Sequence, residues 1–180
     1  MTTILRRLPF STKADETVVQ GERISIRPYQ IIIWISLTNP NTKELHPATP
    51  RFPVILDTGH NHNLSIHESQ LTRWTTDDFP SPARRTAIRD RGFSVALRLA
   101  KIWLFSNLRG TRDHLAERTP LALEIPEGIA IYPSESDFPR LPILGLRVLV
   151  KNRLHLTIDP DRCEVTLRRT GWRTRLLDWL

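Results

Sequence analysis

The chain has 180 residues, of which 39% are hydrophobic and 25% are charged, so its composition excludes a disordered protein and is typical of a folded globular domain. The single cysteine, Cys163, excludes an internal disulfide framework and a cysteine-based zinc cluster. The longest unbroken apolar run, residues 31–35, is far too short to cross a bilayer.

The net charge of +7 suggests a nucleic-acid partner as one hypothesis, because a basic surface gains affinity from counterion release. The arginines are scattered along the chain, however, and no helix-turn-helix, zinc-finger or aromatic RNA-binding motif accompanies them. We therefore interpret the charge as a solvated basic surface and expect no nucleic-acid partner. The first residues lack the long apolar run of a signal peptide, so we expect a cytoplasmic protein without a membrane partner.

The first part of the chain indicates a polar start followed by short strands. Residues 1–22 are polar with little periodicity, and we expect them to form a loose N-terminal leader. Residues 23–37, RISIRPYQIIIWISL, are rich in β-branched and aromatic side chains, which predicts strands. After a turn-rich loop, residues 52–56, FPVIL, form a short apolar strand that runs directly into Asp57.

The rest of the chain continues the β pattern. Residues 85–105 predict a hairpin around Asp90-Arg91-Gly92 with a long second arm. Residues 141–152 predict an apolar strand that passes through Gly145 into one or two helical turns, and a final hairpin follows. We expect one mainly β domain over residues 23–168 and an amphipathic C-terminal tail over residues 169–180.

The segment VILDTGHNHNLSI places Asp57, Thr58 and Gly59 between two apolar strands. An aspartate in a tight loop can project its carboxylate into a cleft, and a threonine hydroxyl can both donate and accept hydrogen bonds that lock the loop against a neighbouring copy. The glycine permits a sharp backbone turn and a close approach. Alone this triplet is a weak signal, because an aspartate that hydrogen-bonds its own turn would explain it.

A second element makes the pattern more specific. Ile143-Leu144-Gly145 lies 86 residues after Asp57 and is followed by a helix-like run and a strand hairpin. With both elements present, the chain resembles the retropepsin-like aspartic proteases, the single-lobed retroviral type. The segment LPILGLRVLVKNRLHLTIDPDRCEVTL is especially similar to bacterial and retrotransposon members. The resemblance covers roughly residues 23–168, with most of the motifs at 51–68 and 140–168.

This resemblance implies a fold and a set of roles. The implied fold is all-β, a closed acid-protease-like barrel with one or two short helices. Asp57 matches the catalytic aspartate, and Thr58 matches the residue that cross-links the two active-site loops at a dimer interface. Gly59 matches the glycine that lets the substrate backbone pass close by.

Two further parts of the resemblance concern the surroundings of the loop. Ile143, Leu144 and Gly145 match the structural segment that packs beneath the catalytic loop. The flap that closes over the substrate should be a hairpin between the two motifs. The hairpin around Asp90-Arg91-Gly92 is the candidate for this flap.

One Asp-Thr-Gly in the chain implies a pair of chains. In this family one ionised carboxylate takes a proton from a bound water, while a second, protonated carboxyl polarises the scissile carbonyl. The chain has no second Asp-Thr-Gly and no Asp-Ser-Gly, so a two-fold dimer must supply the second Asp57. We therefore expect a homodimeric aspartic endopeptidase that acts on polypeptides and needs no metal or other cofactor.

His60 departs from the family pattern, in which the residue after the glycine is usually small. An imidazole there could perturb the carboxyl pair or narrow the substrate channel, so a catalytically inactive peptide-binding module remains the alternative function. His60, His62, His67 and Glu68 also suggest a metal site, and His60 and His62 would share one side of a strand, which could bring two ligands together. No second cluster completes such a site, and we expect no metal.

Overall fold

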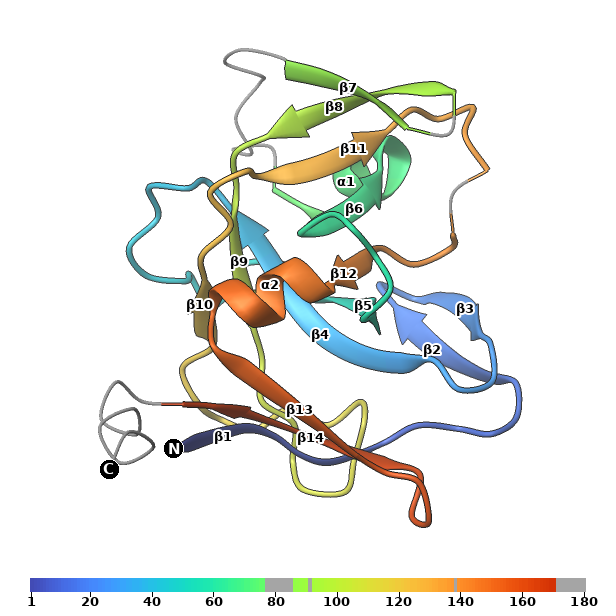
Figure 1. The fold of residues 1–180 in the computed structure, drawn as a ribbon, viewed down its shortest axis with the longest axis vertical. Helices are drawn as coiled ribbons and strands as arrows, with labels where there is room; N and C mark the ends of the chain where they lie inside the picture. The colour runs from blue at the N-terminus through green and yellow to red at the C-terminus, as the bar shows by residue number, and fades with distance from the viewer. Residues whose placement is uncertain (77–85, 91, 138, 171–180) are drawn as a thin grey trace, which may run out of the picture.

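The computed structural model describes residues 1–76, 86–90, 92–137 and 139–170 (Figure 1). The expected all-β class is confirmed. Within the described ranges only two short helices occur among the strands, α1 (Glu68–Trp74) and α2 (Leu146–Lys151). Neither of these two helices has the length and apolar character needed to span a bilayer.

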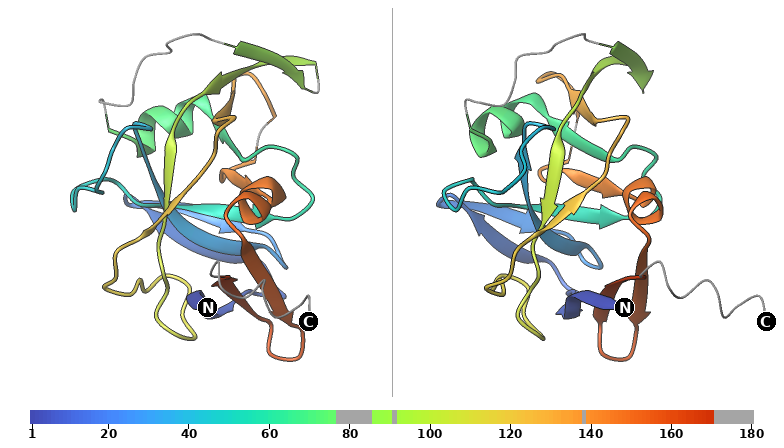
Figure 2. Two further views of the ribbon diagram at one scale, coloured as in Figure 1. Left: turned by 60° about the vertical axis from the view of Figure 1, so that its left-hand side comes forward. Right: turned by 90° about the vertical axis from the view of Figure 1, so that its left-hand side faces the viewer.

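The largest sheet has nine strands in the order β10-β9-β4-β5-β12-β6-β11-β8-β7. They are β4 (Ile31–Thr38), β5 (Phe52–Asp57), β6 (Leu64–His67), β7 (Thr86–Asp90), β8 (Phe93–Arg98), β9 (Lys101–Leu104), β10 (Leu121–Leu123), β11 (Ile129–Tyr132) and β12 (Ile143–Gly145). The sheet bends strongly, so that β7 and β8 lie at one end of the molecule and β4 and β5 near its middle (Figure 1, Figure 2). Its two end strands, β10 and β7, do not pair with each other in the described part of the chain. The expected closed barrel is therefore not found there.

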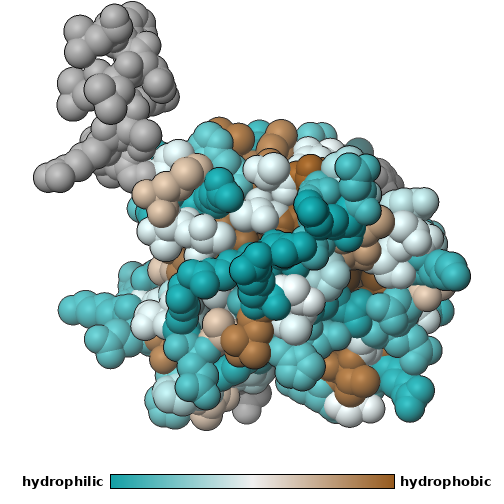
Figure 3. Space-filling view, turned by 90° about the horizontal axis from the view of Figure 1, so that it is seen from below, coloured by the Kyte–Doolittle hydropathy of each residue, from teal (hydrophilic) through white to brown (hydrophobic). Residues whose placement is uncertain are grey.

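Two smaller sheets complete the fold. The first has the order β1-β14-β13, with β1 (Thr2–Pro9), β14 (Glu164–Arg169) and β13 (Leu154–Asp159), and it lies at the end of the molecule opposite β7 and β8 (Figure 1). Seen from that end, the surface is mainly hydrophilic, with hydrophobic residues scattered among polar ones (Figure 3). The second is the hairpin of β2 (Asp15–Val19) and β3 (Glu22–Ile26).

The core explains why β4 and β5 could be predicted. β4 lies between β9 and β5, and its residues Ile32, Ile33, Ile35 and Leu37 are all buried. A strand that is covered on both faces has a continuous apolar sequence instead of an alternating one, and residues 31–35 show this pattern. The same applies to β5, where Val54 is fully buried. The central strands therefore hold the end of β5 in a fixed position.

The N-terminal segment differs from the expected loose leader. Thr2–Pro9 is strand β1, which pairs antiparallel with β14, and Leu5 and Leu8 are buried in the core. The pairing register shifts twice along β1, and Arg7 has a φ of 48°. These irregularities place two leucines three residues apart on the inner side, so the segment lacks the alternation by which a strand is recognised.

The hairpin of residues 85–105 is confirmed in its first part and differs in its second. β7 and β8 pair antiparallel with Asp90 opposite Phe93, although Arg91 lies outside the described residues. The long second arm is wrong, because it divides into β8 and β9. β8 pairs with β11, whereas β9 pairs with β4. Of the expected C-terminal tail, residues 171–180 lie outside the described residues.

Candidate active site

Asp57 is the last residue of β5 and begins a tight turn. Asp57, Thr58 and Gly59 are all exposed to solvent. One oxygen of the Asp57 carboxylate, Oδ1, accepts a hydrogen bond of 2.8 Å from the backbone N–H of Gly59, and the backbone N–H of His60 donates to the Asp57 carbonyl at 3.2 Å. Within the described residues, neither Oδ2 of Asp57 nor the Thr58 hydroxyl has a hydrogen-bond partner. The turn therefore holds the carboxylate at the surface and leaves one of its oxygens available.

The structure brings the two motifs together. β12 lies between β5 and β6, and it pairs parallel with β5 so that Gly145 is opposite Asp57 and Leu144 is opposite Leu56. The backbone N–H of Gly145 donates to the carbonyl of Asn63 at 3.0 Å. Residues 143–145 thus lie directly against both ends of the loop that carries Asp57.

Gly145 is the residue on which this contact depends. A Cβ atom at this position would lie 2.1 Å from the carbonyl oxygen of His62 and 2.6 Å from that of His60. Real Cβ atoms do not approach backbone oxygens this closely, so only glycine fits without displacing the loop. The backbone of residues 60–62 packs on Gly145 because no side chain separates them.

The two histidines of the loop have different surroundings from those expected. They lie in the connection between β5 and β6, so the expectation that they share one side of a strand was wrong. The His60 ring nitrogen Nε2 forms a 2.7 Å hydrogen bond with the hydroxyl of the fully buried Ser65, and the ring contacts His62 edge-on with centroids 5.5 Å apart. In the described part of the chain, no group of three or more histidine, cysteine, aspartate or glutamate residues could hold a metal ion.

A pocket of about 230 Å³ opens beside the loop, which we call the loop pocket. Residues 59–62 form one of its walls, and Ile143 of β12 contributes to it. The remaining wall comes from the β7–β8 hairpin, the end of β11 and the segment that follows, through Asp90, Phe93, Tyr132, Ser136, Asp137 and Pro139. Asp57 lies two residues before the wall of residues 59–62 in the sequence and does not line the pocket.

Asp90, the last residue of β7, reaches the loop that follows Asp57. Asp90 Oδ2 lies 3.7 Å from Nε2 of His62, and it also accepts a hydrogen bond from the hydroxyl of Tyr132. The loop after Asp57, the end of β7 and the end of β11 therefore meet in the lining of the loop pocket. The sequence gives no indication of this contact, because a lone aspartate in a hairpin is normally a turn residue.

A second contact that holds the loop in place, and that the sequence does not predict, joins Asn63 and Glu127. The buried Asn63 side chain donates to the carboxylate of Glu127 at 3.0 Å and to the carbonyl of Gly128 at 3.2 Å. The same carboxylate forms a 2.9 Å salt bridge with Lys151 at the end of α2. The hydrogen bond from Asn63, followed by that from Lys151, lowers the pKa of Glu127 from its ordinary value of 4.5 to about 2.

This shift predicts an acid-sensitive support for the loop. The folded-state pKa is below the unfolded one, so the interaction contributes its full stability above about pH 4.5 and loses it as the pH falls towards about 2. Glu127→Gln should be less stable than the wild type at pH 6, and the difference should vanish near pH 2. Thermal melting across this pH range is the measurement. Glu44→Gln, which removes another glutamate from the surface, is the control, and an equal pH profile for both variants would contradict the assignment.

In comparisons with known proteins, no family model matches the chain, and no curated protein or solved structure matches it.

Proposed function

We propose that the chain is an aspartic endopeptidase of the retropepsin-like type that acts as a homodimer. The observation that carries the proposal is the pairing of Asp57 with Gly145. An exposed carboxylate at the end of a buried strand lies directly beside the second motif of the resemblance. The position of β12 between β5 and β6 also supports an acid-protease-like fold, because it places residues 143–145 beneath the loop that carries Asp57.

The chemistry requires two copies of Asp57. The ionised Asp57 of one chain takes a proton from a water whose oxygen adds to the scissile carbonyl carbon. The protonated Asp57 of the other chain transfers its proton to the carbonyl oxygen, which yields a tetrahedral diol. Collapse of the diol then breaks the C–N bond. The carboxyl group that took the water proton gives it to the leaving nitrogen, and the other, now ionised, takes a proton from a diol hydroxyl, which yields the carboxylic acid product and restores one acid and one base. Two carboxyl groups about 3 Å apart share a single proton, as is general for aspartic proteases, so the pair begins with one acid and one base.

The exposure of residues 57–59 supports the dimer. Thr58 has an exposed hydroxyl without a partner in the described residues, which is the state expected of a group that hydrogen-bonds a second copy across a two-fold axis. We assign the β7–β8 hairpin as the flap because Asp90 and Phe93 line the loop pocket and Asp90 lies beside His62 of the opposite wall. In the dimer, Thr58 of each chain would join the two catalytic loops, and the β7–β8 hairpin of each chain would cover the bound substrate.

One observation favours a second function, a non-catalytic module that binds extended peptides. His60 stands where the family usually has a small residue, and it lines the loop pocket. Its hydrogen bond to Ser65 holds the ring against β6, so the ring occupies space beside the path of a substrate. A module of this kind would bind peptides without turnover, and its affinity would not depend on the Asp57 carboxylate.

The experiment that separates these functions measures cleavage of unfolded protein substrates between about pH 4 and 7, with and without a pepstatin-type inhibitor. The endopeptidase reading predicts cleavage that the inhibitor abolishes. Peptide binding without cleavage, unchanged in Asp57→Ala, would establish the non-catalytic module instead. Cleavage that persists in Asp57→Ala would contradict both.

A further inference from the structure

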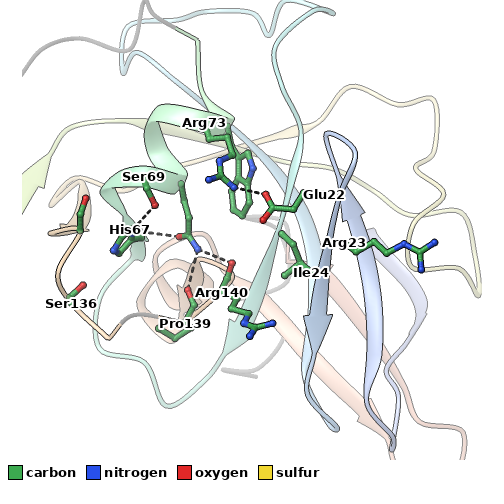
Figure 4. A pocket seen from close by; sticks show the side chains of 12 residues that line it. Glu22, Arg23, Ile24, His67, Ser69, Arg73, Ser136, Pro139 and Arg140 are labelled. Atoms are coloured by element: carbon green, nitrogen blue, oxygen red, sulfur yellow. Dashed lines mark hydrogen bonds and ion pairs between the residues drawn. The ribbon is translucent and has the colours of Figure 1, made fainter.

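A larger pocket, of about 430 Å³, lies next to the loop pocket, and we call it the arginine pocket (Figure 4). It is bounded by β3, by α1 and by the segment between β11 and β12. Ile24 and Trp74, which are both buried, contribute apolar surface. The polar residues around it are Glu22, Arg23, His67, Ser69, Gln70, Arg73, Ser134, Ser136 and Arg140.

The charge of the arginine pocket is positive. Three arginines line it against a single glutamate, Glu22. Arg73 donates to the carboxylate of Glu22, whereas the Arg140 guanidinium makes no ion pair or hydrogen bond with any described residue. In Figure 4 the guanidinium of Arg23 points away from the other labelled side chains. Arg73 and Arg140 are therefore the two cations that a ligand in the pocket would meet.

The wall that carries Arg140 is fixed from inside the fold. The side-chain amide of Gln70, which is 9% exposed, donates to the carbonyls of Pro139 at 3.1 Å and Arg140 at 2.8 Å. Its oxygen accepts from the backbone N–H of His67 at 3.0 Å. Helix α1 thus holds residues 139–140 in place, and the pocket exists before any ligand binds. A preformed pocket reduces the ordering cost of binding.

The two pockets share a wall. Ser136 and Pro139 line both the arginine pocket and the loop pocket, so an extended chain lying along residues 59–62 would have side chains within reach of Arg73 and Arg140. We propose that the arginine pocket binds an aspartate or glutamate side chain of the polypeptide substrate, and so selects acidic sequences near the bond to be cleaved. This inference rests on the proposed function, because it takes the occupant of the loop pocket to be a polypeptide.

A carboxylate is the chemistry that the pocket fits. Guanidinium groups bind carboxylates through paired, charge-assisted hydrogen bonds, and Arg73 already holds one carboxylate, that of Glu22. Ile24 and Trp74 provide apolar contact for the methylene groups of the same side chain. A substrate carboxylate would bind Arg140 directly and would also be attracted by Arg73.

The test uses Asp57→Asn as the background, so that peptides bind without being cleaved. The probes are two extended peptides with identical sequences, one carrying glutamates and its twin carrying glutamines, and their affinities are measured by fluorescence anisotropy. We expect the acidic peptide to bind about fivefold more tightly, a ratio typical of partly exposed charge pairs. The ratio should fall to about one when Arg140→Gln is added, and Arg73→Gln should lower it. Arg109→Gln, in an exposed loop that lines neither pocket, should preserve it.

Charge reversal gives a second measurement. Arg140→Glu should reverse the preference, so that a twin peptide with lysines binds more tightly than the one with glutamates. Equal affinity for the acidic and neutral peptides in the Asp57→Asn background would overturn the proposal. So would an Arg109→Gln variant that loses the preference for the acidic peptide as fully as Arg140→Gln does. These outcomes are independent of turnover. If the wild type never cleaves but the preference is present, the proposed enzyme fails and the acidic-peptide pocket stands.

Discussion

Asp57→Asn is expected to lower peptide cleavage by about a hundred- to ten-thousandfold, the range that general acid–base groups contribute. Asparagine has the same shape and can still accept the hydrogen bond from the Gly59 N–H, so the turn should keep its conformation. It cannot take a proton from water, and the pair of carboxyl groups is lost. Because residue 57 is exposed, the melting temperature should change little. Initial rates on an unfolded protein substrate, together with thermal melting, are the measurements.

The matched control for this variant is Asp161→Asn. Asp161 is also an exposed aspartate in a turn, but it lies in the β13–β14 connection and lines neither the loop pocket nor the arginine pocket. Its replacement should leave cleavage unchanged. If Asp57→Asn retained the wild-type rate, Asp57 would be only a turn aspartate.

Gly145→Ala is expected to lower the free energy of unfolding by about 3 kcal/mol, at the upper end of the cost of overpacking. The added Cβ would lie 2.1 Å from the His62 carbonyl oxygen, and the backbone of the loop would have to move to relieve this contact. The movement would also displace Asp57, so cleavage should fall further than the loss of folded protein explains. Urea unfolding and the rate per folded chain measure the two effects.

Gly110→Ala is the control that distinguishes the steric clash at Gly145 from the cost of placing alanine in an unfavourable backbone conformation. Gly110 has a φ of +76° and open space around its Cβ position, whereas Gly145 has a φ of −94° and no such space. Alanine at position 110 should cost about 1–2 kcal/mol through its left-handed conformation alone, and cleavage per folded chain should not change. An unchanged cleavage rate per folded chain in Gly145→Ala would show that the loop tolerates the displacement.

The sequence predicts those elements whose pattern is local. The continuous apolar residues of β4 and β5 indicate strands buried on both faces, and the turn at Asp90-Arg91-Gly92 indicates a hairpin. The strand of residues 143–145 and the helix after it are also recognisable, because an apolar run passes through a glycine. These elements carry the two motifs, which is why the candidate site could be located before the structure was known.

Features that depend on distant pairings could not be predicted. β1 is irregular because of its register shifts, so its inward leucines do not alternate. The insertion of β12 between β5 and β6 is a matter of topology, and no local pattern encodes it. The support from Glu127 joins residues 64 positions apart, and the contact between Asp90 and Tyr132 joins residues 42 positions apart. In each case, the packing of the whole domain determines which distant strand or residue forms the contact.

The most direct test of the central proposal, that each active site needs Asp57 from two chains, is a mixing experiment. Wild type and Asp57→Asn are unfolded, combined in varying ratios and refolded together. If both carboxylates are required, about one quarter of the dimers in an equal mixture carry both copies of Asp57 and so an intact site, and activity falls as the square of the wild-type fraction. A linear fall, to half the activity in the equal mixture, would show that each chain works alone and would contradict the shared site.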